Sequence, residues 1–189
     1  AKKIAIVQWY SEQEELNDLY YYAIRVGIEN RAQELGYEIQ RFFNNSIFSE
    51  NVQVDGIIAI GKFSKEQIDR LSQISSQLVF VDSDTLPYGF SCVTTDFDNA
   101  VHTVIRHFIH RDLTNIGMIA GEEKTTDGLI QLVDQRFRTF RNDMQEHRLY
   151  NPKNVFIGEF SAQSGYDLMK EAIEQLGDDL PQAFFVAND

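Results

Sequence analysis

The sequence Val93-Thr94-Thr95-Asp96-Phe97-Asp98-Asn99-Ala100 runs into a helical pattern that ends at Arg111, and it divides the chain into two similar halves. Residues 93–95 are typical of the end of a short β-strand. Asp96 stands where a helix N-cap is expected, because its carboxylate accepts hydrogen bonds from otherwise unpaired backbone N–H groups. The apolar residues that follow recur at three- and four-residue steps, which indicates one buried helix face: Ala100, Val101, Val104, Ile105 and Phe108.

Strand and helix patterns alternate on both sides of this segment. Before it we expect strands near 3–8, 37–43, 54–60 and 78–81, with helices over 17–35 and 64–74. After it we expect strands near 115–120, 155–158 and 183–187, with helices over 130–148 and 161–176. Such alternation predicts parallel sheets with right-handed crossovers. The sequence therefore predicts an α/β protein with two Rossmann-like lobes, 1–96 and 97–189, joined at a hinge of Thr95, Asp96 and Phe97.

Composition and charge exclude several classes of protein. The chain has 189 residues, 43% of them hydrophobic, and a formal net charge of −12, so this surface is not suited to bind nucleic acid by itself. The single Cys92 excludes an internal disulfide and fits a reducing compartment. No apolar run approaches the length of a membrane span, and Ala1-Lys2-Lys3 leads directly into a strand rather than a signal peptide.

Known catalytic and cofactor motifs are missing from the sequence. No Gly-x-Gly-x-x-Gly follows the first strand, and neither a phosphate-binding Lys motif nor a Gly-x-Ser-x-Gly elbow is present. His107 and His110 lie three residues apart on one helix, a spacing that could bind a metal, but no carboxylates support it and solvated or packed histidines are the default interpretation. We predict no enzyme activity, no cofactor and no metal site.

Aromatic and polar residues gather where the predicted strands end, which is where open α/β sheets bind ligands. Carboxylates, amides and guanidinium groups bond sugar hydroxyls, and aromatic rings pack against the C–H faces of a sugar. Arg136 is the candidate cation, early in a helix. Taken singly, each residue has a structural alternative, since Asp82 could only cap a turn and Phe160 could only fill the core. The set is Trp9, Tyr10, Tyr20, Phe63, Asp82, Phe160 and Asn188.

An ordered series of short motifs covers nearly the whole chain. It resembles the effector-binding (core) domain of the lactose and galactose repressors, the LacI/GalR family, and looks most like galactose-operon repressors of Gram-positive type. The motifs are Lys3–Val7, Gln8-Trp9-Tyr10-Ser11, Tyr20-Tyr21, Gly27-Ile28-Glu29, Glu34-Leu35-Gly36-Tyr37, Val54–Ile58, Ile60-Gly61-Lys62-Phe63-Ser64, Val81-Asp82, Val93–Asp96, His107-Phe108, Ile116–Gly121, Asp134-Gln135-Arg136 with Phe140, Ser164-Gly165-Tyr166 and Phe185–Asp189.

The resemblance implies a type I periplasmic-binding-protein-like fold with a sugar effector in a hinged cleft. It also implies a cytoplasmic homodimeric repressor of a sugar-utilisation operon, with galactose the favoured effector. Operator DNA would be bound by an N-terminal helix-turn-helix that residues 1–189 do not contain. The alternative is an extracellular sugar-binding protein of a transporter, which shares the fold. The implied effector contacts are Asp82, Arg136, Phe160 and Asn188, followed by Tyr20, Tyr21, Trp9 and Tyr10.

Three departures from the family pattern carry expectations of their own. Residues 44–53 are too few for the helix that usually stands between the second and third strands. Asp112-Leu113 replaces the usual Gly-His. The chain also ends before a last lobe-crossing segment and a further sugar-contacting Asp of the family, so we expect residues 1–189 to hold an incomplete pocket.

Overall fold

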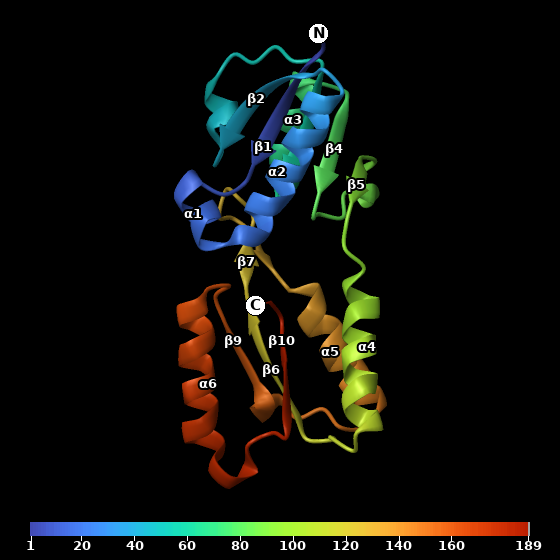
Figure 1. Ribbon diagram of the computed structural model, residues 1–189, viewed down its shortest axis with the longest axis vertical. Helices are drawn as coiled ribbons and strands as arrows, with labels where there is room; N and C mark the ends of the chain where they lie inside the picture. Colours follow the sequence, from blue (N-terminus) through green and yellow to red (C-terminus); the bar gives the residue numbers. More distant parts are fainter. Residues whose placement is uncertain (189) are drawn as a thin grey trace. The chain divides into compact units, whose positions relative to one another are not determined.

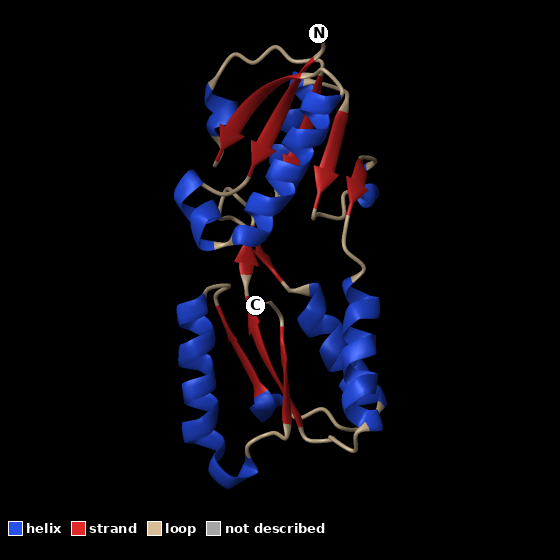
Figure 2. Ribbon diagram, viewed as in Figure 1, coloured by secondary structure: helices blue, strands red, loops and turns tan. Residues whose placement is uncertain are grey.

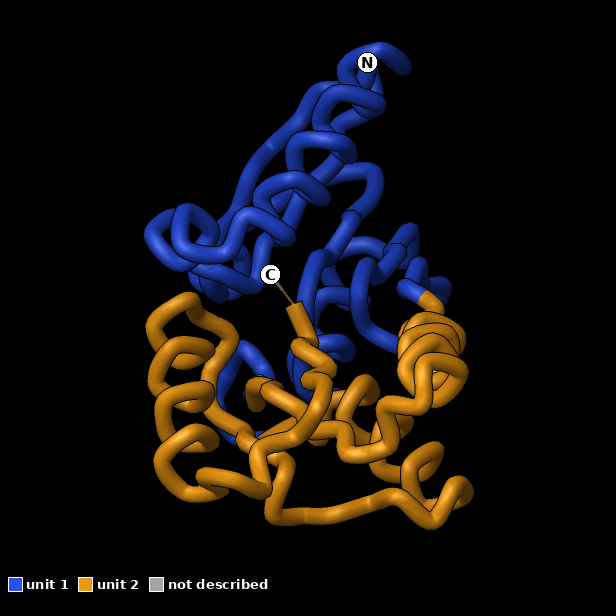
Figure 3. The backbone as a smooth tube through the Cα atoms, turned by 60° about the horizontal axis from the view of Figure 1, so that its bottom comes forward, with its two compact units in different colours: residues 1–95, 124–130 blue, residues 96–123, 131–189 orange. Residues whose placement is uncertain are grey.

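The computed structural model describes residues 1–188, which form two compact units (Figure 3). The first unit consists of Ala1–Thr95 together with Lys124–Ile130, and the second consists of Asp96–Glu123 and the chain from Gln131 onward. The first unit thus gives way to the second within the predicted hinge. The return of residues 124–130 to the first unit is a feature that the predicted division at 96/97 did not include.

The first unit is built on a five-stranded parallel sheet with the strand order β2-β1-β3-β4-β5 (Figures 1 and 2). Every strand expected from the sequence in this half is present. Helix α2 crosses in front of the sheet in Figure 1, and α3 lies behind it. In chain order the elements are β1 (Lys3–Gln8), α1 (Glu12–Asn17), α2 (Leu19–Glu34), β2 (Glu38–Phe43), the 3-10 turn η1 (Ser46–Ser49), β3 (Gly56–Ile60), α3 (Lys65–Ile74), β4 (Leu78–Val81), η2 (Leu86–Tyr88) and β5 (Ser91–Val93).

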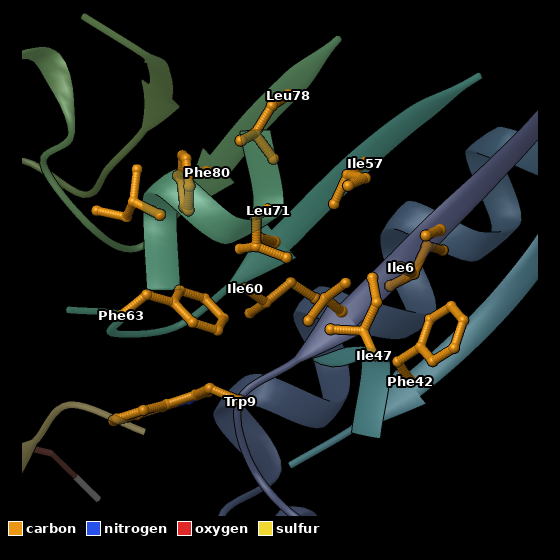
Figure 4. Packing of buried hydrophobic residues seen from close by; sticks show 14 of the residues in the cluster. Ile6, Trp9, Phe42, Ile47, Ile57, Ile60, Phe63, Leu71, Leu78 and Phe80 are labelled. Carbon is orange, nitrogen blue, oxygen red and sulfur yellow. The ribbon is translucent and has the colours of Figure 1, made fainter. Parts of the chain in front are cut away.

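Apolar side chains from the sheet and its helices form the core of the first unit (Figure 4). The inner strands β1 and β3 are mostly buried, as continuous apolar runs in parallel sheets require. Ser64 caps α3: its hydroxyl accepts a hydrogen bond from the Gln67 backbone N–H, and the Gln67 side-chain oxygen accepts one from the Ser64 backbone N–H. The core includes Ile6, Phe42, Ile57, Ile60, Leu71 and Phe80.

The helix predicted over 17–35 is α2, which begins two residues later because Asp18 caps it. The short helix α1 that precedes it was not predicted. The spacing of Tyr20, Ile24, Gly27, Ile28 and Leu35 predicts one buried side of this helix, and that prediction is partly wrong, because Tyr20 is 45% exposed and Leu35 is 56% exposed. A glycine inside a helix suggests either close packing against a strand or a tolerated residue; a Cβ placed on Gly27 would meet nothing within 4 Å, so close packing does not explain it.

The second unit has a three-stranded parallel sheet with the order β10-β6-β9. Asp96 caps α4 as predicted, and Val101 and Ile105 on that helix are fully buried. Helix α6 lies to one side of the sheet in Figure 1, and α4 packs with α5 on the other. The elements are α4 (Phe97–His110), β6 (Ile116–Gly121), α5 (Gln135–Glu146), the 3-10 turn η3 (Pro152–Asn154), β9 (Val155–Gly158), α6 (Ala162–Leu176), η4 (Gly177–Asp179) and β10 (Ala183–Val186).

A short hairpin precedes α5, where the sequence predicted a loop and then a helix from residue 130. Strands β7 (Glu123–Lys124) and β8 (Gln131–Leu132) pair with each other. The Asp127 carboxylate stabilises the turn by accepting hydrogen bonds from the Thr125 hydroxyl (2.7 Å) and the Leu129 backbone N–H (3.1 Å). Local side-chain bonding of this kind competes with helix formation, so the helix begins five residues later than predicted.

In residues 1–188, no helix combines the length and the apolar character that crossing a membrane would require.

Candidate functional site

Aromatic rings form a cluster where β1 ends in the first unit. The Trp9 and Tyr10 rings are stacked, with centroids 4.8 Å apart, and both meet the edge of Tyr21 at 5.3 and 4.8 Å. Tyr20 adds a further edge contact with Tyr21 at 5.1 Å. The Tyr10 hydroxyl donates to Asp18 at 3.0 Å, so the residue that caps α2 also positions this ring. Such edge and offset contacts stabilise aromatic groups beyond their buried area.

Asp82 follows β4 directly and is the acidic centre of this cluster. Its backbone adopts a left-handed conformation with φ at +65°, which Asp tolerates better than most residues. The Tyr21 hydroxyl donates to Asp82 Oδ2, and Lys62 Nζ lies 3.0 Å from the same oxygen. Lys62 Nζ also donates to the backbone carbonyl of Asp82. The first turn of α2 and the ends of β3 and β4 therefore meet around one carboxylate.

Gly61 makes room for the Trp9 ring at the end of β3. A Cβ at Gly61 would lie 1.9 Å from Trp9 Cγ, and the backbone there has φ at +113°. Only glycine satisfies both conditions without strain. Trp9 is 6% exposed, and its indole nitrogen has no hydrogen-bond partner within the described residues.

A buried ionic network supports the base of the aromatic cluster. Arg25 contacts the carboxylates of Glu15 at 2.6 Å and Glu29 at 2.8 Å, and Glu29 is also bonded by Arg41. Gln8, in β1, donates to Glu15 at 2.8 Å. Burial raises the pKa of Glu29, but hydrogen bonds from Arg41 and Arg25 outweigh it, so the pKa lies below its usual range.

Arg136 is the centre of a second set of residues, which lies entirely in the second unit. Its guanidinium lies over the Phe97 ring at 4.7 Å and over the Phe160 ring at 4.9 Å. Asp134 binds it in a bidentate manner, at 3.0 Å to Nε and 2.8 Å to Nη2. Nη1 donates to the Ala187 carbonyl at 3.0 Å. Two ring contacts together with bidentate pairing hold the guanidinium in place.

The parallel strands of the second unit bring these residues together. Phe160 follows β9, and a Cβ on Gly121 at the end of β6 would lie 2.8 Å from its ring. Ala187 and Asn188 follow β10, and Asn188 is exposed. Asp134 caps α5, whose first turn carries Arg136. Each residue thus stands at the carboxyl end of a strand or at the start of a helix, the usual ligand position in such sheets.

The structure assembles the predicted residues in two groups. Trp9, Tyr10, Tyr20, Tyr21 and Asp82 lie together in the first unit. Arg136 and Phe160 lie together in the second, with Asn188 next to the Ala187 carbonyl that Arg136 binds. Their roles as effector contacts stay predictions, as do the hinge roles of the three residues at 95–97.

One aromatic candidate belongs to the core instead. Phe63 is 7% exposed and packs edge-on against Phe80, with ring centroids 6.0 Å apart. Its position after a strand was the reason for naming it, but the side chain turns into the hydrophobic cluster of the first unit (Figure 4). Trp9 and Tyr21 are as buried and belong to the same cluster, but Trp9 also stacks on Tyr10 and Tyr21 bonds Asp82. The ring contact found for Phe63 in the described residues is with Phe80, so we assign Phe63 to the core.

The sequence did not predict the charged partners of Asp82 and Arg136, although both partners stand in motifs that resemble the family. Lys62 binds Asp82, and Asp134 binds Arg136. The carboxylate of Glu123 also lies 3.9 Å from Arg136. The sequence signal for Lys62 was a charged residue just after a predicted strand, and the signal for Asp134 was a carboxylate two residues before Arg136. Within residues 1–188 no cluster of three or more metal-binding side chains occurs.

A shallow cavity of about 400 Å³ lies elsewhere in the first unit and includes none of the predicted effector contacts. Arg70 lies over the Phe48 ring at 4.3 Å along its wall. Gln67 and Asp127 also line it. Its mixed polar walls do not resemble the aromatic and acidic group around Asp82.

Comparison with known proteins decides the family. Residues 105–189 match the family model of a periplasmic binding protein-like domain. The chain is 47% identical over 187 residues to the HTH-type transcriptional regulator GalR of Streptococcus thermophilus, an alignment that spans 99% of this chain. The chain belongs to the LacI/GalR family. It is also 32% identical to the HTH-type transcriptional regulator GanR of Bacillus subtilis, in an alignment that spans 100% of this chain.

Solved structures of the LacI/GalR family show the same fold. The lac repressor dimer bound to operator has a TM-score of 0.76 at 16% identity, covering 100% of this chain and 57% of that one. A transcriptional regulator solved as a cellobiose complex has a TM-score of 0.77 at 19% identity, covering 100% of this chain and 59% of that one. The predicted type I periplasmic-binding-protein-like fold is confirmed. The chain spans 56% of the length of the Streptococcus relative and 58% of the Bacillus relative.

Proposed function

We propose that this chain is the effector-binding part of a sugar-responsive transcriptional repressor that controls a sugar-utilisation operon, with galactose as the favoured effector. The observation that carries the proposal is the group around Asp82, where a carboxylate held by Lys62 and Tyr21 stands beside stacked aromatic rings. A sugar offers hydroxyls for the carboxylate and apolar C–H faces for the rings.

The second unit supplies a matching set of groups. Arg136 lies over two aromatic rings, and Asn188 adds an exposed amide after β10. Both sets combine charge, amide or hydroxyl groups with aromatic surface, the chemistry that favours a polyhydroxylated ligand over a purely apolar one. No catalytic role is proposed for any of these residues, and the regulators named among the relatives agree with a protein that is not an enzyme.

The partners of the whole protein are part of the same proposal. Operator DNA is bound by an N-terminal helix-turn-helix outside the present sequence, as the names of the relatives support. The net charge of −12 agrees with a domain that does not bind DNA itself. The protein acts in the cytoplasm as a homodimer. The named relatives are all regulators, which favours this function over a sugar-binding protein of a transporter.

Calorimetry on the natural full-length protein tests the effector. We expect one class of site that binds a neutral monosaccharide, with galactose first in a panel of neutral and phosphorylated sugars. A folded protein that binds none of them would contradict the effector function. Fluorescence anisotropy with labelled operator DNA then separates the two kinds of protein, because a repressor changes its DNA affinity when the sugar is added and a transport protein binds no operator.

A further inference from the structure

Lys62 is placed beside the proposed effector carboxylate in a way that points to a direct role. Two of the three donors of its ammonium group are directed at Asp82, one at Oδ2 (3.0 Å) and one at the backbone carbonyl. The side chain of Lys62 keeps 22% of its surface exposed, whereas that of Asp82 keeps 7%. Lys62 is therefore the more accessible member of a pair whose acidic half is mostly covered.

The Asp82 carboxylate is used unevenly by its protein partners. Tyr21 and Lys62 both donate to Oδ2, and the side-chain donors found for Asp82 within residues 1–188 all reach that atom. Oδ1 is thus the oxygen left to accept from a ligand. An acceptor and a donor stand next to each other at the ends of β3 and β4, which are neighbours in the sheet.

We propose that Lys62 and Asp82 together recognise two adjacent hydroxyl groups of a neutral sugar. Asp82 Oδ1 accepts a hydrogen bond from one hydroxyl, and the third donor of Lys62 Nζ is directed at the oxygen of its neighbour. The inference rests on the proposed function and makes Lys62 a specificity-determining residue. It also disfavours a sugar phosphate at this position, because the phosphate would lie against the Asp82 carboxylate.

Lys62 could instead serve only to neutralise Asp82, and the two roles predict different binding. A purely structural lysine affects every ligand alike. A lysine that donates to one hydroxyl affects only ligands that carry that hydroxyl, since an analogue lacking it has no bond to lose. Galactose and its singly deoxygenated analogues therefore distinguish the roles.

The experiment measures the dissociation constants of galactose and its 2-, 3-, 4- and 6-deoxy analogues for the natural full-length protein and for Lys62→Met. We expect Lys62→Met to weaken galactose binding roughly ten- to a hundredfold, the value of one charge-assisted hydrogen bond. For one deoxy analogue the loss on going from wild type to variant should be at least tenfold smaller than the loss for galactose. Lys65→Met, a change to an exposed lysine three residues further on, serves as the matched control and should leave every constant unchanged.

Three results would overturn the inference. Galactose could bind Lys62→Met as well as wild type, or the variant could weaken galactose and every analogue by one common factor. If Lys62→Met does not fold, the dissociation constants of wild type alone decide. Removal of either of two neighbouring hydroxyls must then weaken binding at least tenfold. If no two neighbouring hydroxyls show this loss, the proposal is excluded. In all of these cases galactose still binds, so the proposed function stands. A wild type that binds no sugar would instead remove the proposed function, and this inference with it.

Discussion

Arg136 is the residue on which the second group of proposed effector contacts depends. Its guanidinium is fixed by Asp134, the Ala187 carbonyl and two aromatic faces. Replacement by alanine removes the charge and leaves Phe160 without its stacking partner. We expect Arg136→Ala to weaken sugar binding by two to four decades, since two charge-assisted hydrogen bonds contribute roughly 3–6 kcal/mol.

Titration calorimetry on wild type and Arg136→Ala checks this expectation, with thermal melts to show that the variant is folded. Arg138→Ala is the matched control, because Arg138 is exposed on the same helix turn. An unchanged dissociation constant for Arg136→Ala would remove Arg136 from the site.

Gly61 is a second residue whose replacement has a defined outcome. An alanine there would combine a positive φ with a Cβ 1.9 Å from Trp9 Cγ. We expect Gly61→Ala to lower the free energy of unfolding by at least about 2 kcal/mol and to displace the Trp9 ring. Chemical denaturation followed by tryptophan fluorescence measures both effects, since Trp9 is the sole tryptophan.

Gly89 provides the control for that prediction. It also has a positive φ, +83°, but a Cβ there would meet nothing within 4 Å. Gly89→Ala therefore reports the backbone strain alone, and we expect a smaller loss with unchanged fluorescence. Equal losses in the two variants would show that contact with Trp9 adds nothing.

Individual site residues differed in how far the sequence could predict them. Asp82 and Arg136 were identified because each stands in a motif whose order along the chain is distinctive. The Lys62–Asp82 pair could not be derived, since it depends on a left-handed backbone at Asp82 and on two neighbouring strands ending at the same level. Phe63 shows the reverse error: a residue after a strand can turn inward, and sequence position alone does not reveal it.

At the level of elements, the ionic network joins α1, α2 and β2, and Glu29 is the carboxylate that both Arg25 and Arg41 bind. The pKa of Glu29 lies below its unfolded value, because the bonds from Arg41 and Arg25 outweigh the effect of burial. A carboxylate with a depressed pKa stabilises the fold above its unfolded pKa of about 4.3, and that contribution is lost as the pH falls through the folded value.

Glu29→Gln should therefore cost about 2 kcal/mol at pH 7 and lose less stability than wild type as the pH falls from about 5 to 3. Thermal melts across this range measure the difference. Glu34→Gln, on the same helix, is the control, since its side chain and that of its partner Arg31 are 65% and 69% exposed. Parallel pH profiles for wild type and Glu29→Gln would contradict the prediction.

Glu29 shows why hydrophobic periodicity alone does not define the buried face of α2. Periodicity marks apolar residues as buried, but here a glutamate, Glu29, is 7% exposed because two arginines satisfy it. The ends of strands β1, β3 and β4 were predicted within about two residues, because a short apolar run between polar residues is typical of a buried strand. The hairpin before α5 was missed, since hydrogen bonds of Asp127 rather than hydrophobic spacing define it.

For the whole molecule, the proposed function requires two copies of the chain. Sedimentation velocity of the natural full-length protein should give twice the mass of one chain at micromolar concentration. A monomer under these conditions would count against a repressor and in favour of a transport protein. Measurement with and without galactose shows in addition whether the effector alters the association.

Residues 124–130 also determine the order in which the protein can be completed on the ribosome. Thr126 bonds the Lys62 carbonyl at 3.0 Å and the Trp9 carbonyl at 3.3 Å, so the first unit lacks these bonds until residue 126 has emerged. By then β6 has already emerged from the ribosome, although its six residues are all buried in the folded protein. Its sheet partners, β9 and β10, are synthesised later. During synthesis, the apolar strand β6 of the second unit is therefore without its sheet partners at the time when Thr126 completes the hydrogen bonds of the first unit, and it needs protection from aggregation at that stage.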